Sequence, residues 1–393
     1  MASLNVFEIS APGKVILHGE HSVVYGKPAI AGPIGLRTYL TYKKLNQPEI
    51  ILDFASIPFK SSLSLQAFNK FLAQYNCHEQ LQPLEFLERM RSSDAFIFAP
   101  FVNDQPSAQS TKERFSLGTT LYLINRVLRC EGINSLADGF QLTITSVMSI
   151  GAGLGSSAGY GVCVSAGAFV ISRLAKHELT EQNAGTFTLQ QTEYLEKISN
   201  WAFDSEIVMH ERPSGIDNTI CTYGNLIKFK RGEPFENITF RQQVHMLIVD
   251  TGVSRVTSKL VAQVAKLKCN HPKMMDSILD AMGYLVDDVV GILEDEMERS
   301  DELGTLVSIN NNLLRAIGVS HPSLEKVFQL ADDCGFHAKL TGAGGGGCAL
   351  VFLPRDFDSR KEFVQLKTML KDAGFSWIQT TMGGAGVEFR VIE

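Results

Sequence analysis

A glycine-rich segment between a predicted strand and a predicted helix constrains the fold of this chain most strongly. Residues 151–159 read Gly-Ala-Gly-Leu-Gly-Ser-Ser-Ala-Gly. Glycines let backbone N–H groups approach an anion closely because no Cβ stands in the way, and the N-terminus of a following helix adds unpaired N–H donors and a favourable dipole. The segment therefore predicts a phosphate-binding loop.

The residues on either side provide the context that such a loop requires. Residues 140–147 alternate apolar and polar side chains, the period of two that is typical of a half-buried strand. Residues 158–175 are apolar and small, which predicts a buried helix. Each of its three interior glycines costs about 1 kcal/mol relative to alanine, so we expect close packing at Gly159, Gly161 and Gly167.

Composition and charge exclude several classes of protein. The chain has 393 residues, of which 45% are hydrophobic and 20% charged, and this predicts a globular protein of two domains. A net charge of −6 without a block of Lys or Arg argues against a nucleic-acid partner. Seven cysteines without a CxxC pair are typical of reduced residues in an intracellular protein, not of a disulfide framework or a zinc finger.

No segment of the sequence has the pattern of a targeting signal or a membrane span. The N-terminus lacks the basic and apolar regions of a signal peptide, and no segment offers about 18 uninterrupted apolar residues. We therefore expect a cytoplasmic protein without a membrane partner.

The order of predicted strands and helices differs between two parts of the chain. The first part contains strands and then helices, with strands at 4–10, 14–18, 36–42 and 140–147 and helices at 158–175 and 188–209. The second part contains a strand at 246–250, several long helices, then a strand, a helix and two short strands. Residues 228–234 are the best boundary, so we predict domains at 1–229 and 230–393, the second a two-layer α+β domain.

One helix of the second part has an unusually clear apolar stripe. Its apolar residues step by four, three, four and three, which predicts one face packed in a core, at Ile278, Met282, Leu285, Val289 and Ile292.

Lys14 is the first candidate for chemistry. If residues 14–18 form a strand, Lys14 shares a partly apolar face with Ile16 and His18, where it needs a partner unless it reaches solvent at the edge of the sheet. Glu20 and His21 follow closely, but their spacing is not that of a helical zinc site.

Glu206 is the second candidate. On the helix 188–209 it falls within about 80° of the apolar face formed by Leu195, Ile198 and Ala202. An ionised carboxylate on the buried side costs several kcal/mol unless it is paired, hydrogen-bonded or bound to a metal. The alternative is that the end of the helix turns toward solvent.

Two further segments stand out. Pro213-Ser-Gly marks a turn and places Asp217 in the first turn of a short helix, where a carboxylate is structural or catalytic. Residues 339–348 read Lys-Leu-Thr-Gly-Ala-Gly-Gly-Gly-Gly-Cys and lead into a strand, so this backbone passes very close to another loop or to a ligand.

A serine hydrolase is a rival interpretation, because residues 155–159 also satisfy G-x-S-x-G. Ser157 would then be the nucleophile, with a later acid and base chosen from Asp217 or Asp250 and from His321 or His337. This interpretation leaves Lys14 and the other glycines without a role. A dinucleotide-binding site is weaker still, because the third glycine and the downstream acidic residue are missing.

Three segments resemble the motifs of the GHMP kinase family, in the family's order. They are residues 11–21 (Ala-Pro-Gly-Lys-Val-Ile-Leu-His-Gly-Glu-His), 153–158 and 339–348, and the segment 213–218 accompanies them. Ser22-Val-Val-Tyr25 follows the first motif, as in the mevalonate branch and unlike the galactokinase branch. One departure is Ser149-Ile150, where the family usually has a proline, so the entry to the loop is less rigid.

This resemblance implies an α+β, two-domain GHMP kinase fold, with an S5-like N-terminal ATP- and Mg²⁺-binding domain, a ferredoxin-like C-terminal domain and the active site between them. It implies ATP-dependent phosphorylation of the 5-hydroxyl of mevalonate in isoprenoid and sterol precursor biosynthesis, by a homodimer. The alternatives are another small-molecule kinase of the family, acting on phosphomevalonate or a sugar, and a catalytically dead sensor. Lys14, Ser157, Glu206 and Asp217 are all present, which argues against the sensor.

The resemblance also implies residue roles. Ser157 and Glu206 would hold Mg²⁺ between the β- and γ-phosphates. Asp217 would take the proton of the mevalonate hydroxyl, with Lys14 keeping it ionised and stabilising developing charge, and no phosphoenzyme is needed. Glu20, His21 and Ala343 would line the mevalonate site. ATP would be bound by Lys14, Gly151, Ala152, Gly153, Leu154, Gly155, Ser156, Ser157 and Ala158.

Overall fold

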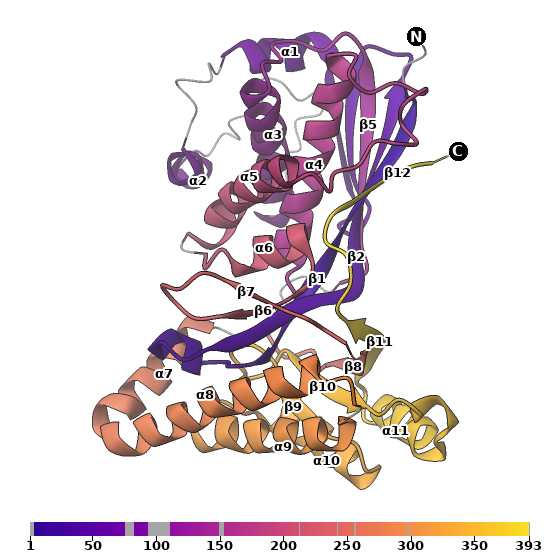
Figure 1. Ribbon diagram of the computed structural model, residues 1–393. Helices are drawn as coiled ribbons and strands as arrows, with labels where there is room; N and C mark the ends of the chain where they lie inside the picture. Colours follow the sequence, from indigo (N-terminus) through magenta and orange to yellow (C-terminus); the bar gives the residue numbers. More distant parts are fainter. Residues whose placement is uncertain are drawn as a thin grey trace.

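The computed structural model describes residues 4–74, 82–92, 111–148, 153–211, 213–241, 243–254, 257–297 and 299–392. Their strands join into one twelve-stranded sheet. Two long antiparallel strands, β1 (Val6–His18) and β2 (Ala29–Leu45), run along most of the length of the molecule (Figure 1). The two strands predicted at 4–10 and 14–18 are therefore one strand, whose register shifts between Pro12 and Gly13.

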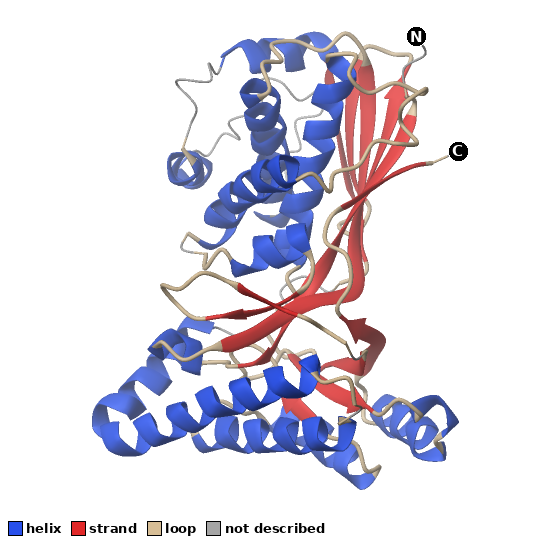
Figure 2. Ribbon diagram, in the orientation of Figure 1, coloured by secondary structure: helices blue, strands red, loops and turns tan. Residues whose placement is uncertain are grey.

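The N-terminal part is a sheet covered by helices on one face (Figure 2). Its outer strands are β3 (Glu49–Phe54), β4 (Phe59–Ser64) and β5 (Gly139–Ser146), and β3 runs parallel to β5. Sequence reasoning missed β3, although Ile50, Leu52 and Phe54 alternate as a half-buried strand requires. The helices are α1 (Leu65–Gln74), α2 (Pro83–Ser92), α3 (Thr111–Cys130), α4 (Ser156–Ala175), α5 (Thr192–His210) and α6 (Ile216–Tyr223).

The C-terminal part packs helices against the other end of the sheet. Its strands are β8 (Val244–Asp250), β9 (Ala338–Leu340), β10 (Cys348–Leu353) and β11 (Ser376–Met382), and its helices are α7 (Thr257–Asn270), α8 (Pro272–Glu294), α9 (Ser300–Ala316), α10 (Pro322–Asp333) and α11 (Lys361–Asp372). The predicted stripe of α8 is confirmed, because Met282, Leu285, Val289 and Ile292 are buried and Ile278 is half-buried.

The two parts share the sheet and part of the core. Met382 of β11 pairs with Ile34 of β2, and the last strand, β12 (Glu388–Val391), returns to pair with β1. Residues 228–234, predicted to be a linker, are the end of β6 (Leu226–Phe229) and the turn into its hairpin partner β7 (Glu236–Ile238). The division at 229/230 stays a prediction.

Helix α4 is the central helix behind the glycine loop. The expected close packing at its interior glycines is confirmed: a Cβ on Gly161 would lie 2.1 Å from Ser205 Oγ of α5, and one on Gly167 would lie 2.9 Å from Leu40 Cδ2 of β2. By length and composition alone, α4 could cross a membrane. However, 78% of its most apolar stretch is buried inside the protein, as in the core helix of a globular protein.

Candidate active site

A cavity of about 700 Å³ lies where the motifs singled out in the sequence meet. Its walls come from β1, the start of α4, the end of α5, the start of α6 and the loop before β10. The predicted site residues that line it are Lys14, Glu20, His21, Gly153, Gly155, Ser156, Ser157, Glu206, Asp217 and Ala343. Gly151 and Ala152 lie outside the described residues. Residues separated by more than 300 positions are thus brought to one site.

The glycine loop is held against β1 by a backbone hydrogen bond. The backbone N–H of Lys14 donates to the carbonyl of Leu154 at 2.8 Å. Gly155, the residue before α4, has φ +74°, and a Cβ there would lie 2.8 Å from Lys14 Cγ. The sequence therefore needs glycine at this position, for its backbone conformation and for its lack of a side chain. Ser156 and Ser157, the first two residues of α4, line the cavity, so the helix N-terminus lies at its wall, as an anion site requires.

Lys14 has the partner that its position demands. Its Nζ lies 3.1 Å from Oδ2 of Asp217. Asp217 stands in the first turn of α6, as predicted, and the residue before the helix is Gly215 with φ +80°. The alternative of a free surface lysine is wrong, because the Lys14 side chain is only 10% exposed and paired. The pair thus places a cation directly beside the Asp217 carboxylate at the start of α6.

Glu206 is buried, with 3% of the residue exposed, so the alternative of a helix end turned to solvent is wrong. Burial and the nearby charge of Asp217 raise the pKa of Glu206 to about 7, while Ser157 and Lys14 act in the opposite direction. Within the described part of the chain, Glu206 Oε1 has no hydrogen-bond partner. A buried, unpaired carboxylate oxygen is costly unless something absent from the protein itself completes it.

A divalent cation fits this arrangement. The Glu206 carboxylate and the Ser157 hydroxyl are hard oxygen donors of the kind that Mg²⁺ prefers. No group of three or more His, Cys, Asp and Glu side chains suited to a metal occurs among the described residues. The protein would thus supply few ligands, which is the usual case for Mg²⁺ bound together with phosphates and water.

Sequence reasoning missed His210, which also lines the cavity. Its Nε2 lies 3.1 Å from Ser157 Oγ and 3.8 Å from Glu206 Oε2. Burial lowers the pKa of His210, so the neutral imidazole is favoured. The signal was present, since residues four apart on a helix are neighbours and His210 follows Glu206 by four.

The hydrolase triads considered from the sequence are not assembled. His321 accepts a hydrogen bond from the N–H of Ser323 as the cap of α10, and His337 bonds Ser308; neither lines the cavity. His210 does contact Ser157, but the same Nε2 faces both Ser157 and Glu206. A triad instead needs an acid on Nδ1 to orient the ring.

Contacts between residues distant in sequence bring together the residues that were expected to line the site of the phosphate-accepting substrate. His21 Nε2 lies 2.9 Å from the carbonyl oxygen of Ala343. The Glu20 carboxylate is buried against Lys339 and Asn310. Lys339 opens the last motif, but sequence reasoning gave its side chain no role.

Comparisons with known proteins agree with this geometry. A family model described as "GHMP kinases C terminal" matches residues 292–385. The mevalonate kinase of Gibberella zeae is 35% identical over 97% of this chain and 76% of its own length, and that of Bos taurus is 31% identical over 97% and 94%. A crystal structure of L. major mevalonate kinase in complex with R-mevalonate has a TM-score of 0.66 at 24% identity, covering 98% of this chain and 97% of that chain.

These matches confirm the predicted fold class, a mixed α and β GHMP kinase fold, over nearly the whole chain. The relatives are similar to this chain through both of its parts, so the likeness is not confined to the glycine loop. The chain therefore belongs to the mevalonate kinase family of GHMP kinases.

Proposed function

We propose that this chain transfers the γ-phosphoryl group of ATP to the 5-hydroxyl of mevalonate. The observation that carries the proposal is the Lys14–Asp217 ion pair at 3.1 Å, in the same cavity as Ser157 and the buried Glu206. Family membership supports the reaction, and the L. major relative has been solved with R-mevalonate. Phosphoryl transfer needs positioning and charge stabilisation rather than a covalent intermediate, and this site offers both.

ATP binding is supported by two kinds of residue that line the cavity. The N–H groups at the start of α4, together with Lys14, would hold the triphosphate. The lining also includes apolar and aromatic side chains that suit a nucleoside, among them Phe54, Ile57, Phe115 and Tyr160.

Mg²⁺ would be held by Ser157 and Glu206. When bound, the ion neutralises charge on the β- and γ-phosphates. Glu206 Oε1 supports this assignment, because no described residue of the chain supplies it with a hydrogen-bond partner.

Asp217 would act as the general base. Its carboxylate would accept the proton of the attacking hydroxyl while Lys14 balances the negative charge that develops. The part of the site where mevalonate would bind would be lined by His21, Glu20 and the backbone at Ala343. His21 would contribute its ring, and Ala343 its carbonyl.

Replacement of the base tests the proposal. We expect Asp217→Asn to lower kcat by roughly 10² to 10⁴ with little change in the KM for ATP, the range typical of a lost general base. Asp250→Asn is the matched control, because Asp250 accepts a bond from the N–H of Gly252 and does not line the cavity. Near-full activity of Asp217→Asn would contradict the mechanism.

The acceptor is tested by ATP consumption over mevalonate, phosphomevalonate, galactose and homoserine. We expect turnover with mevalonate, and a preference for another acceptor would make the chain a different kinase of the same fold. A fluorophosphonate probe should leave Ser157 unlabelled. We also propose a cytoplasmic homodimer, which light scattering showing the mass of one chain would contradict.

A further inference from the structure

A fully buried ion pair joins the first and last motifs at the wall of the cavity. Lys339 of β9 donates to Oε1 of Glu20, and neither side chain has any exposed surface. Asn310 of α9 donates to Oε2 of Glu20 at 3.2 Å, and Lys339 also donates to the carbonyl of Leu340 at 2.8 Å. Both carboxylate oxygens of Glu20 are therefore engaged by the protein itself.

Such a pair contributes geometry more than stability. Removing two charges from water costs more than an ordinary contact returns, whereas leaving one of them unpaired is strongly unfavourable. Two histidines feel the charges of this pair. His18 is completely buried and its pKa is lowered by burial and by Lys339, so it stays neutral, and the pKa of His21 is lowered by burial although Glu20 acts in the opposite direction. Glu20 is thus the counter-ion of Lys339.

The backbone next to Glu20 is strained. His21 has φ 59° and ψ −46°, and the N–H of Ser22 donates to the carbonyl of Glu20 at 2.6 Å. This is a γ-turn of the positive-φ form, which is rare and costly for a residue other than glycine. A conformation of this kind persists only where its surroundings determine it.

Three contacts hold the His21 turn in this conformation, and each joins residues more than 300 positions apart. They are the Glu20–Lys339 pair, the bond from Thr341 Oγ1 to the Ile16 carbonyl at 3.0 Å, and the contact of His21 Nε2 with the Ala343 carbonyl at 2.9 Å. The strained His21 turn is held between them, and His21 lines the cavity.

We propose that Lys339 and Glu20 are a positioning pair, which holds the His21 turn in the shape that the acceptor site needs, and that the Glu20 carboxylate is not itself a substrate ligand. The inference rests on the proposed function, in which His21 lines the acceptor end of the cavity.

The test compares Glu20→Gln, Lys339→Met and the double variant. We expect each single variant to raise the KM for mevalonate by roughly tenfold to hundredfold, the effect of a misplaced contact, with the KM for ATP unchanged. The double variant leaves no unpaired charge and should recover most of the loss. A double variant as impaired as Glu20→Gln would make Glu20 a substrate ligand and overturn the proposal. If Lys339→Met does not fold, the comparison of Glu20→Gln with the double variant still decides.

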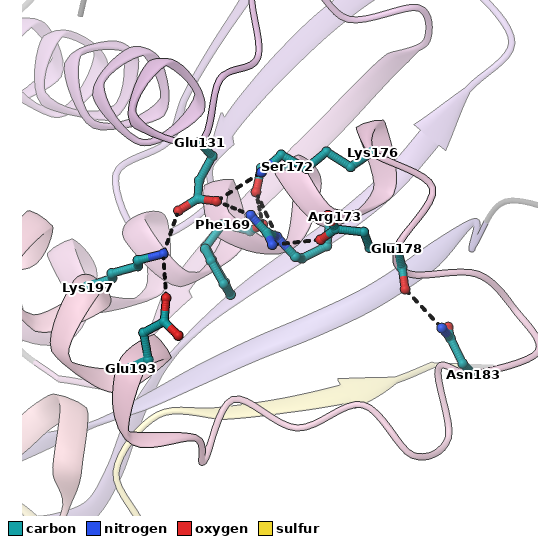
Figure 3. Close-up of polar contacts among 9 residues, drawn as sticks. All are labelled: Glu131, Phe169, Ser172, Arg173, Lys176, Glu178, Asn183, Glu193 and Lys197. Carbon is teal, nitrogen blue, oxygen red and sulfur yellow. Dashed lines mark hydrogen bonds and ion pairs between the residues drawn. The ribbon is translucent and has the colours of Figure 1, made fainter.

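The buried Glu131–Arg173 pair is the matched control, because it joins α3 to α4 and its residues do not line the cavity (Figure 3). Arg173→Met should lower the melting temperature without raising the KM for mevalonate. A raised KM in this control would mean that lost stability alone explains the effect, against the proposal. A wild-type enzyme that does not turn over mevalonate would contradict the proposed function instead, whereas unchanged KM values in active variants would contradict only the positioning pair.

Discussion

At the scale of single residues, the environment of Glu206 decides most about the site. Its carboxyl is buried, one of its oxygens has no hydrogen-bond partner among the described residues, and a second carboxylate stands nearby in Asp217. The protein therefore disfavours the ionised form, and a bound divalent cation would reverse that preference.

This environment predicts an unusual stability effect. Because the folded-state pKa of Glu206 is raised to about 7 from 4.5, its protonated form stabilises the fold at low pH, and this contribution is lost as the pH rises through that window. Glu206→Gln does not lose this stability at higher pH, because the Gln side chain does not ionise. We expect its free energy of unfolding in EDTA near pH 8 to exceed that of wild type by roughly 3 kcal/mol. Urea unfolding measures this, and the difference should vanish below about pH 4.5. A less stable variant near pH 8 would contradict the assignment.

The same substitution should impair function. Loss of a carboxylate ligand raises the Mg²⁺ concentration needed for half-maximal activity, so a titration of activity with Mg²⁺ should shift sharply upward for Glu206→Gln. An unchanged Mg²⁺ dependence would remove Glu206 from the metal site.

At the scale of elements, the junction between the glycine loop and α4 links the phosphate site to Lys14. Gly155 has φ +74°, and a Cβ there would meet Lys14. Gly132, after α3, has φ +78°, but a Cβ there would meet none of the described residues. The two glycines thus share a backbone conformation and differ only in their surroundings.

We expect both Gly155→Ala and Gly132→Ala to lose about 1 to 2 kcal/mol of stability to backbone strain. Only Gly155→Ala should also displace Lys14, raising the KM for ATP and lowering kcat. Thermal melting and steady-state kinetics measured side by side separate the two effects. Equal kinetics in the two variants would show that the Gly155–Lys14 contact does not matter.

A second set of element contacts ties α3, α4 and α5 together. Glu131 accepts from Arg173 and Lys176 at the end of α4 and from Lys197 on α5 (Figure 3). Burial raises the pKa of Glu131, but these cations outweigh it and the net direction is down. The ion pairs of Glu131 therefore stabilise the fold at neutral pH, and this contribution is lost as the pH falls through the lowered pKa of Glu131.

Glu131→Gln should accordingly lower the free energy of unfolding near pH 7 by about 2 to 3 kcal/mol, less than for a fully enclosed pair because Lys176 and Lys197 are partly exposed. Urea unfolding at several pH values measures the loss, which should shrink in acid. A loss of the same size at all pH values would point to packing instead of charge.

At the scale of the whole molecule, the sheet runs through both predicted domains. The last strand, β12, pairs with β1, and Arg37 of β2 fastens the segment before it by donating to the Gly386 carbonyl at 2.7 Å. One apolar cluster also contains buried residues of both parts, such as Leu17 and Ile34 with Met246 and Val289.

This continuity predicts that residues 1–229 do not fold alone. The fragment would lack β12 and would expose its share of the common apolar cluster, so we expect aggregation or a non-cooperative thermal transition, measured by size-exclusion chromatography and circular dichroism. A monomeric fragment with a sharp melting transition would instead support a domain boundary at 229/230.

The sequence by itself determined the elements whose signal is local. Period-two alternation predicted β5, the apolar stripe predicted α8, and the glycines of α4 predicted its close packing. Helical period also placed Glu206 on the buried side of α5. These inferences succeed because burial on one face of an element leaves a periodic trace in the residues that form it.

Only the tertiary structure decided the contacts between residues distant in sequence. Lys339 meets Glu20, and β12 returns to β1. No periodicity connects such partners, since each lies on a different element and the pairing depends on how the elements pack. The sequence therefore determined which chemistry was available, and the packing of distant segments decided which side chains share one cavity.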